Sequence, residues 1–466
     1  MAAANLTNSI KSFSPSVIIV GGGLAGSECA WQLALAGHKV VIIEQRPVSS
    51  TEAHKTDRLG ELVCSNSLKS TDPLSAPGLL KDELTRMKSL ILEAAMASQV
   101  PAGQALAVDR DAFAAYITSK IDKHPRIEVI RAEVKHYEEL VISGAKGLIP
   151  VVLATGPLSG RSLMESLEPL VGKSLYFYDA IAPIIAGESI NREVAFMQNR
   201  HFKGQGGEVL KDDEGDYLNC PFSEEEYNNF IAALKAAERV PSKDFEKLIY
   251  FQGCQPVEAL LEKGDRTLTF GPMKPVGLTD PRTGHRPHAA IQLRKEDSEG
   301  RAWNMVGFQT KLKYPEQQRV FRLIPGLENA EFYRLGSLHR NTYVNSPTLL
   351  DSQFRLKTMP MLHFAGQVTG VEGYLESTAI GALVGRLLHL RFSGSIAEPP
   401  LPPATTALGA LAHAIVFGKA KDFQPMNINW GLVPLDGIGE RDHEKKEKLC
   451  SRARRQFGHW LSLFGF

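Results

Sequence analysis

The chain has 466 residues, and its 53 lysine and arginine residues against 52 aspartate and glutamate residues give a formal net charge of +1. This balance excludes a molecule that binds nucleic acid or membranes through its overall charge, so that any polyanion site must be a local patch. No apolar stretch approaches the roughly 18 residues that a membrane span needs, and the first residues, MAAANLTNSIKSFSPS, lack the regions of a secretion signal. We predict a cytoplasmic protein with no membrane partner; a short organelle-targeting tail is the alternative.

The first predicted elements form a βαβ unit. The apolar run 17–20 is typical of a buried parallel strand, and 24–36 is typical of a helix that ends at Gly37. Residues 39–44 follow as a second strand. Further along, 148–160 and 361–390 each contain a strand that breaks into a glycine-containing turn. We expect these segments to share one nucleotide-binding sheet.

The composition predicts how the chain is divided. Between 191 and 326 it shifts to charged helices and short strand-like pieces, which indicates an inserted domain. The fold class is therefore α/β: a Rossmann-like domain with a doubly wound parallel sheet and an inserted, smaller α+β domain. The expected divisions are a tail (1–15), the two parts of the dinucleotide domain (16–190 and 327–392), the insertion (191–326), a Pro-rich connector (393–406) and a C-terminal helical region (407–466).

A glycine-rich turn lies between the first predicted strand and helix. It consists of Gly21, Gly22, Gly23, Leu24, Ala25 and Gly26. In a G-x-G-x-x-G turn the first glycine allows a tight bend, the second lets the backbone approach a pyrophosphate, and the third permits close packing of the helix on the strand. Glu44, at the end of the second strand, is placed to accept a hydrogen bond from a ribose hydroxyl. A turn that holds no ligand is the alternative.

A second glycine-rich turn, FAGQVTGVEGY, contains Gly366 and Gly370 and opens a late helix. FAD is a long cofactor whose flavin end needs a second glycine-rich contact, so this turn favours FAD over NAD. Glycines that only allow helix packing are the alternative.

The cysteines are Cys29, Cys64, Cys220, Cys254 and Cys450. An odd, widely spaced set with no C-x-x-C pair argues against disulfides or a zinc site, so we predict reduced thiols and no metal. Cys64 stands among polar residues, and Cys254 stands between a glycine and a proline two residues on. Each is a candidate catalytic thiol, with an inert packing role as the alternative. Cys29 lies in a predicted helix and suits a packing role. Cys220 stands between the packing and the catalytic interpretations, and Cys450, in a charged terminal helix, has no expected role in the chemistry.

Long blocks of the sequence resemble a known family. In chain order they include GGGLAGSECAWQLALAG, RPVSSTEAHKTDRLGELVCSNSLKS, LNCPFSEEE, FQGCQPVEAL, NMVGFQTKL, FAGQVTGVEGYLES and FQPMNINWGL. The chain resembles the folate- and FAD-dependent tRNA uracil-5-methyltransferases (TrmFO) from about residue 16 to 432; the first 15 residues and the basic tail after 437 match nothing in the family's pattern.

The resemblance implies an activity. Such an enzyme methylates C5 of the T-loop uridine of tRNA, at tRNA position 54, with 5,10-methylenetetrahydrofolate as carbon donor, FAD as carrier and reductant, and NAD(P)H as electron source. By resemblance Cys254 is the nucleophile that adds to C6 of uracil, Cys64 is the second catalytic cysteine, and Tyr374 lies by the flavin. The opposite division, in which Cys64 is the nucleophile and Cys254 handles the proton, is the alternative.

The sequence leaves the surrounding cations and the exact substrate open. Lys274, Arg294, His339 and Arg340 are candidates for contacts to thiolate, folate or phosphate, and structural ion pairs are the alternative for each. The rival functions are the same chemistry on ribosomal RNA, an FAD-dependent oxidoreductase of small molecules, and a noncatalytic RNA-binding protein that keeps FAD structurally.

Overall fold

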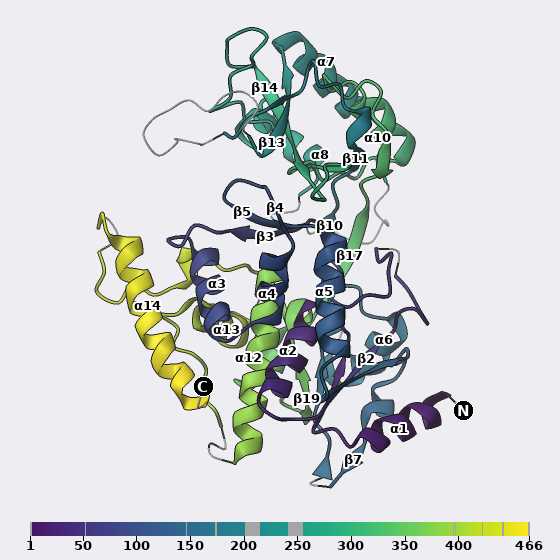
Figure 1. The fold of residues 1–466 in the computed structure, drawn as a ribbon, viewed down its shortest axis with the longest axis vertical. Helices are drawn as coiled ribbons and strands as arrows, with labels where there is room; N and C mark the ends of the chain where they lie inside the picture. The colour runs from purple at the N-terminus through teal and green to yellow at the C-terminus, as the bar shows by residue number, and fades with distance from the viewer. Residues whose placement is uncertain are drawn as a thin grey trace.

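The structure is a computed structural model, and it describes residues 2–51, 53–145, 147–172, 175–200, 215–240, 255–394, 396, 398–421, 423–439 and 442–464. Figure 1 shows a large domain around the parallel sheet and a smaller domain at the top of the view. Among the described residues, no helix combines the length and the hydropathy that crossing a bilayer requires.

The large domain is built on a six-stranded sheet. Its strand order is β18-β19-β9-β1-β2-β6, and all neighbours are parallel except the edge strand β18. The strands are β1 Val17–Val20, β2 Val40–Glu44, β6 Ile127–Arg131, β9 Val151–Leu153, β18 Arg355–Leu356 and β19 Met359–Phe364. Strands β1, β2 and β9 are buried along their whole length, as near-continuous apolar runs predict for a covered parallel sheet. The sheet thus joins segments from the beginning, middle and end of the chain.

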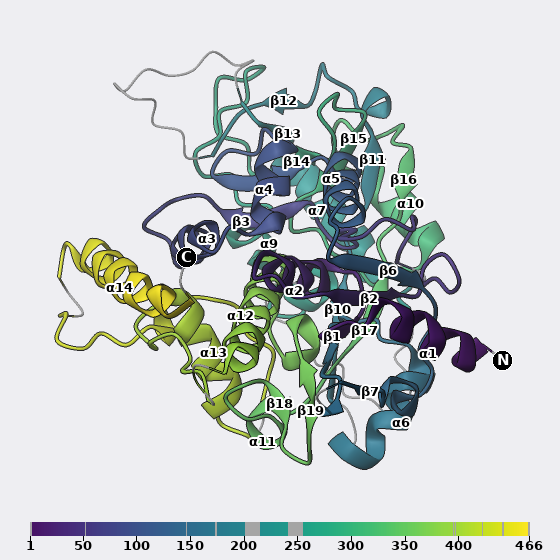
Figure 2. The same cartoon turned by 60° about the horizontal axis from the view of Figure 1, so that its bottom comes forward.

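Two helices cross closely beside this sheet. Helix α2, Leu24–Leu35, follows the glycine turn, and helix α12, Tyr374–Ser393, follows the second turn; they lie side by side in Figures 1 and 2. A Cβ atom at Gly381 would lie 2.3 Å from the Ala25 carbonyl oxygen, so only glycine permits this approach. The crossing brings the start of α12 to the start of α2.

Other helices and short strands complete the large domain. They are α1 Ala2–Phe13, α3 Ala76–Arg86, α4 Leu90–Ala97, α5 Arg110–Asp122, α6 Arg161–Val171, α11 Ser346–Leu349, α13 Ala407–Phe417, α14 Lys445–Leu461, β3 Ser67–Ser70, β4 Gln99–Val100, β5 Ala105–Val108, β7 Ser143–Gly144 and β8 Gly147–Leu148. Several helices start at the expected caps: the side chains of Ser75, Asp109 and Thr406 each accept a backbone N–H of the first turn.

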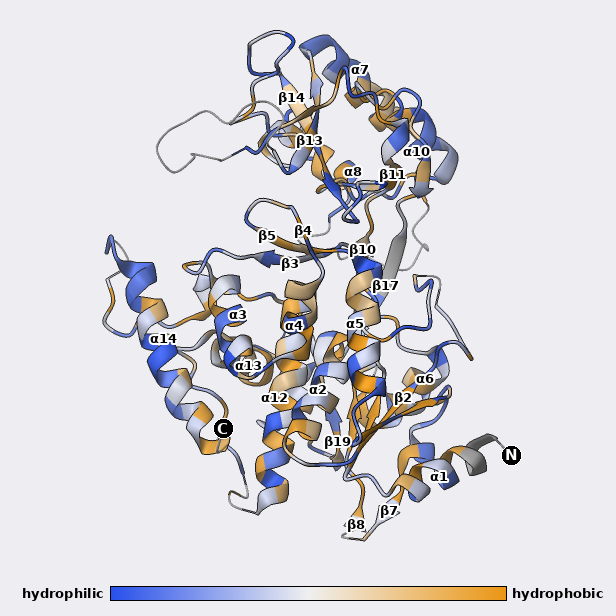
Figure 3. Ribbon diagram, in the orientation of Figure 1, coloured by the Kyte–Doolittle hydropathy of each residue, from blue (hydrophilic) through white to orange (hydrophobic). Residues whose placement is uncertain are grey.

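Both ends of the chain contribute to the large core. The predicted tail forms α1, and its Leu6 and Ile10 are buried. Helix α14 is mostly hydrophilic (Figure 3), yet Leu449, Phe457 and Trp460 on one face are buried in the same core. The charged C-terminal run is therefore a one-sided helix with a packed face.

The smaller domain has an antiparallel sheet of order β12-β13-β14-β15-β11-β16 and its own apolar core. Its elements are β11 Ile184–Ala186, β12 Phe196–Met197, β13 Tyr217–Phe222, α7 Glu224–Ala236, α8 Val257–Leu261, α9 Thr267–Phe270, β14 Ala289–Lys295, β15 Ala302–Met305, α10 Tyr314–Phe321 and β16 Phe332–Arg334. A two-stranded ribbon, β10 Leu175–Ala180 with β17 Leu338–Tyr343, joins it to the large domain. This sheet spans 184–334, which is wider than the insertion of 191–326 that the composition predicts.

Candidate active site

The glycine turn bends directly from β1 into α2. Gly21 has φ +102°, and a Cβ atom there would lie 2.5 Å from the Ala154 carbonyl oxygen. A Cβ atom at Gly26 would lie 1.9 Å from the Gly21 carbonyl oxygen, whereas one at Gly23 would meet nothing within 4 Å. The first and third glycines are therefore required by packing, and the middle one presents open backbone at the N-terminus of α2. That end of a helix favours a phosphate.

A cavity opens in front of this turn. Its walls come from the turn, the end of β2, the segment after β9, and the start of α12. The lining includes Gly21, Gly23, Leu24, Ala25, Glu44, Arg46, His54, Thr155, Gly156, Gln367, Tyr374 and Ser377. It lies at the carboxyl ends of parallel strands, where α/β folds bind nucleotides. An open phosphate cradle at one end and an aromatic residue in the lining fit a flavin dinucleotide.

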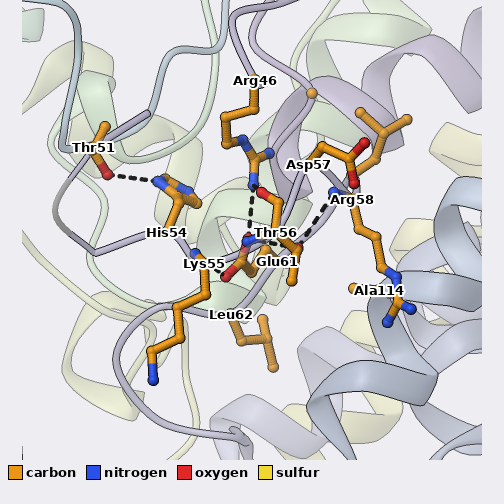
Figure 4. A network of polar contacts seen from close by, with 12 residues as sticks. Arg46, Thr51, His54, Lys55, Thr56, Asp57, Arg58, Glu61, Leu62 and Ala114 are labelled. Carbon is orange, nitrogen blue, oxygen red and sulfur yellow. Dashed lines mark hydrogen bonds and ion pairs between the residues drawn. The ribbon is translucent and has the colours of Figure 1, made fainter. Parts of the chain in front are cut away.

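Glu44 holds the turn and belongs to a buried polar network, of which Figure 4 shows the part around Arg46 and Glu61. Its Oε2 accepts the Gly22 N–H at 2.7 Å, and its Oε1 accepts the Arg46 N–H at 3.1 Å and Arg46 Nε at 2.7 Å. Burial opposes the charge on Glu44, but the hydrogen bonds from Arg46 and Gly22 outweigh it and lower the pKa of this carboxyl. A carboxylate has about four acceptor positions, so one remains at Oε2 for a ribose hydroxyl.

The same network closes the segment that leads to Cys64. Arg46 Nη1 donates to Glu61 Oε2 at 2.9 Å and to the Thr56 carbonyl oxygen at 3.2 Å. Glu61 in turn accepts the backbone N–H groups of Lys55 and Thr56 at 2.8 and 3.1 Å. Arg46 stands two residues after Glu44, but no sequence motif marks it as a site residue. These bonds fix the wall of the cavity between β2 and Cys64.

The Cys64 loop, defined as residues 62–66, is held from both domains. The Tyr374 hydroxyl accepts the Cys64 and Ser65 N–H groups at 2.7 and 3.2 Å. The Cys64 carbonyl oxygen accepts Arg110 Nη2 at 3.0 Å and Arg334 Nη2 at 2.9 Å. Burial and the neighbouring Cys64 raise the pKa of the Tyr374 hydroxyl, which keeps it neutral. A half-buried thiol thus stands beside the cavity with two guanidinium groups near it.

A family model described as "Glucose inhibited division protein A" matches residues 16–395. The methylenetetrahydrofolate–tRNA-(uracil-5-)-methyltransferase TrmFO of Geobacter sulfurreducens is 52% identical over 448 residues, which cover 96% of this chain and 99% of the relative. The chain belongs to the TrmFO family. A TrmFO of Nitratidesulfovibrio vulgaris is likewise 52% identical over 447 residues, covering 96% of this chain and 90% of that relative. The resemblance stated from the sequence is confirmed.

Solved structures support the fold. Aquifex aeolicus GidA in its form I crystal superposes with a TM-score of 0.64 at 16% identity, covering 96% of this chain and 77% of that chain. The predicted α/β class with a parallel sheet and a second domain is confirmed for this TrmFO family member.

The four described cysteines of this TrmFO family member differ in burial. Cys29, Cys220 and Cys450 are buried, and Cys64 is half-buried. Burial raises the pKa of Cys29 well above its usual range and that of Cys220 to about 12, so these thiols stay protonated. Cys254 lies outside the described residues. Among the described residues, no cluster of His, Cys, Asp or Glu is arranged to hold a metal.

The two glycines of the second turn pack against neighbouring side chains, whereas other residues of that turn line the cavity. A Cβ atom at Gly366 would lie 2.5 Å from the Cβ of Ala25, and one at Gly370 would lie 2.5 Å from the ring of Phe423. The cavity is lined instead by Gln367, Tyr374 and Ser377 from the same segment. Gly366 and Gly370 therefore have the close contacts that the packing alternative expects, and a contact of either with the cofactor stays a prediction.

The candidate cations are dispersed. Arg294 Nε donates to Asn66 Oδ1 at 3.0 Å and so braces the Cys64 loop. Lys274 lines a separate cavity of the smaller domain. The side chains of His339 and Arg340 lie outside what the structure describes. Arg110 and Arg334, which the sequence analysis did not single out, are the cations at Cys64.

Proposed function

We propose that this chain methylates C5 of the T-loop uridine of tRNA, with methylenetetrahydrofolate as one-carbon donor, FAD as cofactor and a reduced nicotinamide as electron source. The names of its relatives state tRNA, uracil C5 and methylenetetrahydrofolate. The observation that carries the proposal is the half-buried Cys64 thiol, whose loop is hydrogen-bonded by a tyrosine of the dinucleotide cavity.

The residues of the cavity have distinct roles in holding FAD. The open backbone at Gly23 and the N-terminus of α2 would hold the pyrophosphate, and Glu44 would accept a ribose hydroxyl at its free acceptor position. Tyr374, which lines the same cavity, would border the flavin. When bound and reduced, the flavin supplies the carbon unit and the hydride.

The two thiols divide the remaining chemistry. C5 of uracil becomes nucleophilic when a thiolate adds at C6, and the family pattern gives this role to Cys254. Cys64 removes the C5 proton after the new carbon bond has formed. The Nη2 atoms of Arg110 and Arg334 donate to the Cys64 carbonyl oxygen at 3.0 and 2.9 Å and so hold the backbone of this residue beside the cavity.

The test is transfer of labelled carbon from methylenetetrahydrofolate to an unmodified tRNA transcript in the presence of reduced nicotinamide. A second transcript has cytidine in place of the T-loop uridine, and a ribosomal RNA transcript is the third substrate. We expect label in the first transcript alone. Label in the cytidine transcript would contradict the site, and label in the ribosomal transcript alone would contradict the substrate.

Variants separate the thiols. Cys254→Ala is expected to abolish transfer while flavin absorbance is retained, and Cys64→Ala is expected to reduce transfer at least a hundredfold. Cys29→Ala is the matched control, because Cys29 is a buried packing thiol, and it should transfer label at the normal rate. Normal transfer by Cys254→Ala would remove that residue from the mechanism.

A further inference from the structure

A further cavity opens at the junction of the two domains, and we call it the junction pocket. It has a volume of about 360 Å³ and is lined by Ala53, Lys55, Val63, Ile181, Tyr314, Phe332, Tyr333, Arg334, Leu335 and Ser337. This volume is at the small end of the roughly 300–1,000 Å³ range of ligand pockets. It therefore suits one planar ring with its attached groups rather than a whole dinucleotide.

Val63 shows that the junction pocket lies next to the dinucleotide cavity and Cys64. This residue lines both the junction pocket and the dinucleotide cavity, and it directly precedes Cys64. Arg334 connects the same places, because Nη1 donates to the Val63 carbonyl oxygen at 3.0 Å and Nη2 to that of Cys64 at 2.9 Å. A ligand in the junction pocket thus meets the Cys64 loop at the residue next to Cys64.

Two tyrosines give the pocket aromatic surfaces that water still reaches. Tyr314, the first residue of α10, is 58% exposed, and Tyr333, on the edge strand β16, is 55% exposed. Large aromatic side chains are normally buried, and a pair of them at one small pocket indicates a stacking surface.

The charges of the pocket have one sign. Among the residues that the structure describes, its lining contains Lys55 and Arg334 and no aspartate or glutamate. The Lys55 backbone N–H binds Glu61, while its side chain extends away from the polar network in Figure 4 and is exposed. The Nε of Arg334 is buried and has no hydrogen-bond partner among the described residues. Aromatic rings with cations and no carboxylates are typical of nucleotide sites in single-stranded RNA-binding proteins.

We propose that the junction pocket binds a nucleoside adjacent to the target uridine, stacking its base on Tyr314 or Tyr333 with Lys55 at the neighbouring phosphate. This inference rests on the proposed function and adds the place where the RNA is held. The pocket is open to solvent on one side and meets the Cys64 loop on the other. An RNA strand could therefore place one nucleoside in the pocket while the rest of the strand continues outside. A flipped target base leaves its neighbours unstacked, and the tyrosines replace the lost stacking.

The test compares KM values in the methylation assay. Tyr314→Ala and Tyr333→Ala are each expected to raise KM for the tRNA transcript about tenfold, as loss of one base–aromatic stack predicts. KM for methylenetetrahydrofolate and the rate of flavin reduction without RNA stay unchanged. Phe270→Ala is the matched control: Phe270 is 76% exposed in the same domain but does not line the pocket.

Lys55→Gln tests the phosphate contact. The slope of log K against log salt for tRNA binding should become shallower by about 0.7, the value for one single-strand phosphate. Lys263→Gln, at an exposed lysine of the smaller domain, should leave the slope unchanged.

Two results would overturn the proposal. The first is a KM for RNA that is unchanged in both tyrosine variants. The second is a raised KM for methylenetetrahydrofolate together with an unchanged KM for RNA, since this would assign the pocket to the folate. If the wild-type protein methylates no RNA, the proposed function fails, and binding of a labelled single-stranded T-loop oligonucleotide still decides the pocket: equal affinity of wild type and Tyr333→Ala would refute it.

Discussion

Replacing Arg46 with methionine is expected to destabilise the protein strongly. The Arg46 side chain is 3% exposed and forms ion pairs with Glu44 at 2.7 Å and Glu61 at 2.9 Å. Methionine keeps the volume but leaves two carboxylates without their counter-ion. Breaking a buried pair in this way costs about 3–5 kcal/mol. Urea denaturation followed by circular dichroism measures the change in the free energy of unfolding.

The pH dependence distinguishes lost charge compensation from lost packing. In the wild type the pKa of Glu44 lies below its ordinary value of 4.5. Without Arg46, burial raises this pKa above 4.5, so the folded state binds the proton more readily than the unfolded chain. The stability of the Arg46→Met variant therefore rises as the pH falls towards 4.5. The difference in free energy of unfolding between wild type and Arg46→Met should be smaller at pH 5 than at pH 7.5.

A matched variant lies in the same segment. Arg58 pairs with Asp111 at 3.5 Å, with side chains 41% and 86% exposed, and both Arg46 and Arg58 appear in Figure 4. Arg58→Met should cost about 0–1 kcal/mol, as exposed pairs do. If Arg46→Met costs no more than Arg58→Met, or the same at both pH values, the buried network does not stabilise this wall of the cavity.

Two further predictions concern the glycine turn and a buried histidine. Gly23→Ala should change the free energy of unfolding of the flavin-free protein by no more than about 0.5 kcal/mol but weaken flavin binding at least tenfold, because the new Cβ points into open space where the phosphate binds. Gly21→Ala should instead prevent folding. Equal flavin affinity of Gly23→Ala and wild type would contradict the phosphate-binding role of this turn. His363 is 2% exposed, and burial lowers its pKa to about 4. The unfolded chain takes up this proton below pH 6.5, so its contribution to stability is complete above pH 6.5 and is lost between pH 6.5 and 4. The urea midpoint should fall over that window and fall less in His363→Gln.

The parts of the fold that local sequence determines could be predicted. The β1–α2–β2 unit follows from an apolar run, three glycines at fixed spacing and a second apolar run, all within 28 residues, 17–44. Each signal acts on its neighbours in the chain: Gly21 at φ +102° makes the bend and Gly26 allows the helix to approach. The prediction needs no knowledge of distant residues.

The partners of Cys64 could not be predicted in this way. Tyr374 is 310 positions away in the sequence and Arg334 is 270 positions away. Both bind backbone atoms of the loop, and a backbone N–H or carbonyl oxygen is the same at every residue, so no side-chain pattern marks the pairing. The sequence indicates that Cys64 is a polar-loop thiol, and only the folded chain identifies what holds it.

The smaller domain is attached to the large domain through a narrow joint and through contacts at the Cys64 loop. Chain connections cross between the domains beside the β10–β17 ribbon, and such narrow joints leave an inserted domain free to rotate unless side contacts fix it. The Cys64 loop supplies these contacts: Asn66 Nδ2 donates to the Val108 carbonyl oxygen at 2.9 Å in one domain and to that of Lys295 at 3.0 Å in the other. A rotation that moved the smaller domain would break the bonds from Asn66 to Lys295 and from Arg334 to the Cys64 carbonyl oxygen. The bonds of Tyr374 and Arg110 to Cys64 lie within the large domain and would remain. The Cys64 loop is therefore anchored in the large domain and serves as a point to which the smaller domain is fixed.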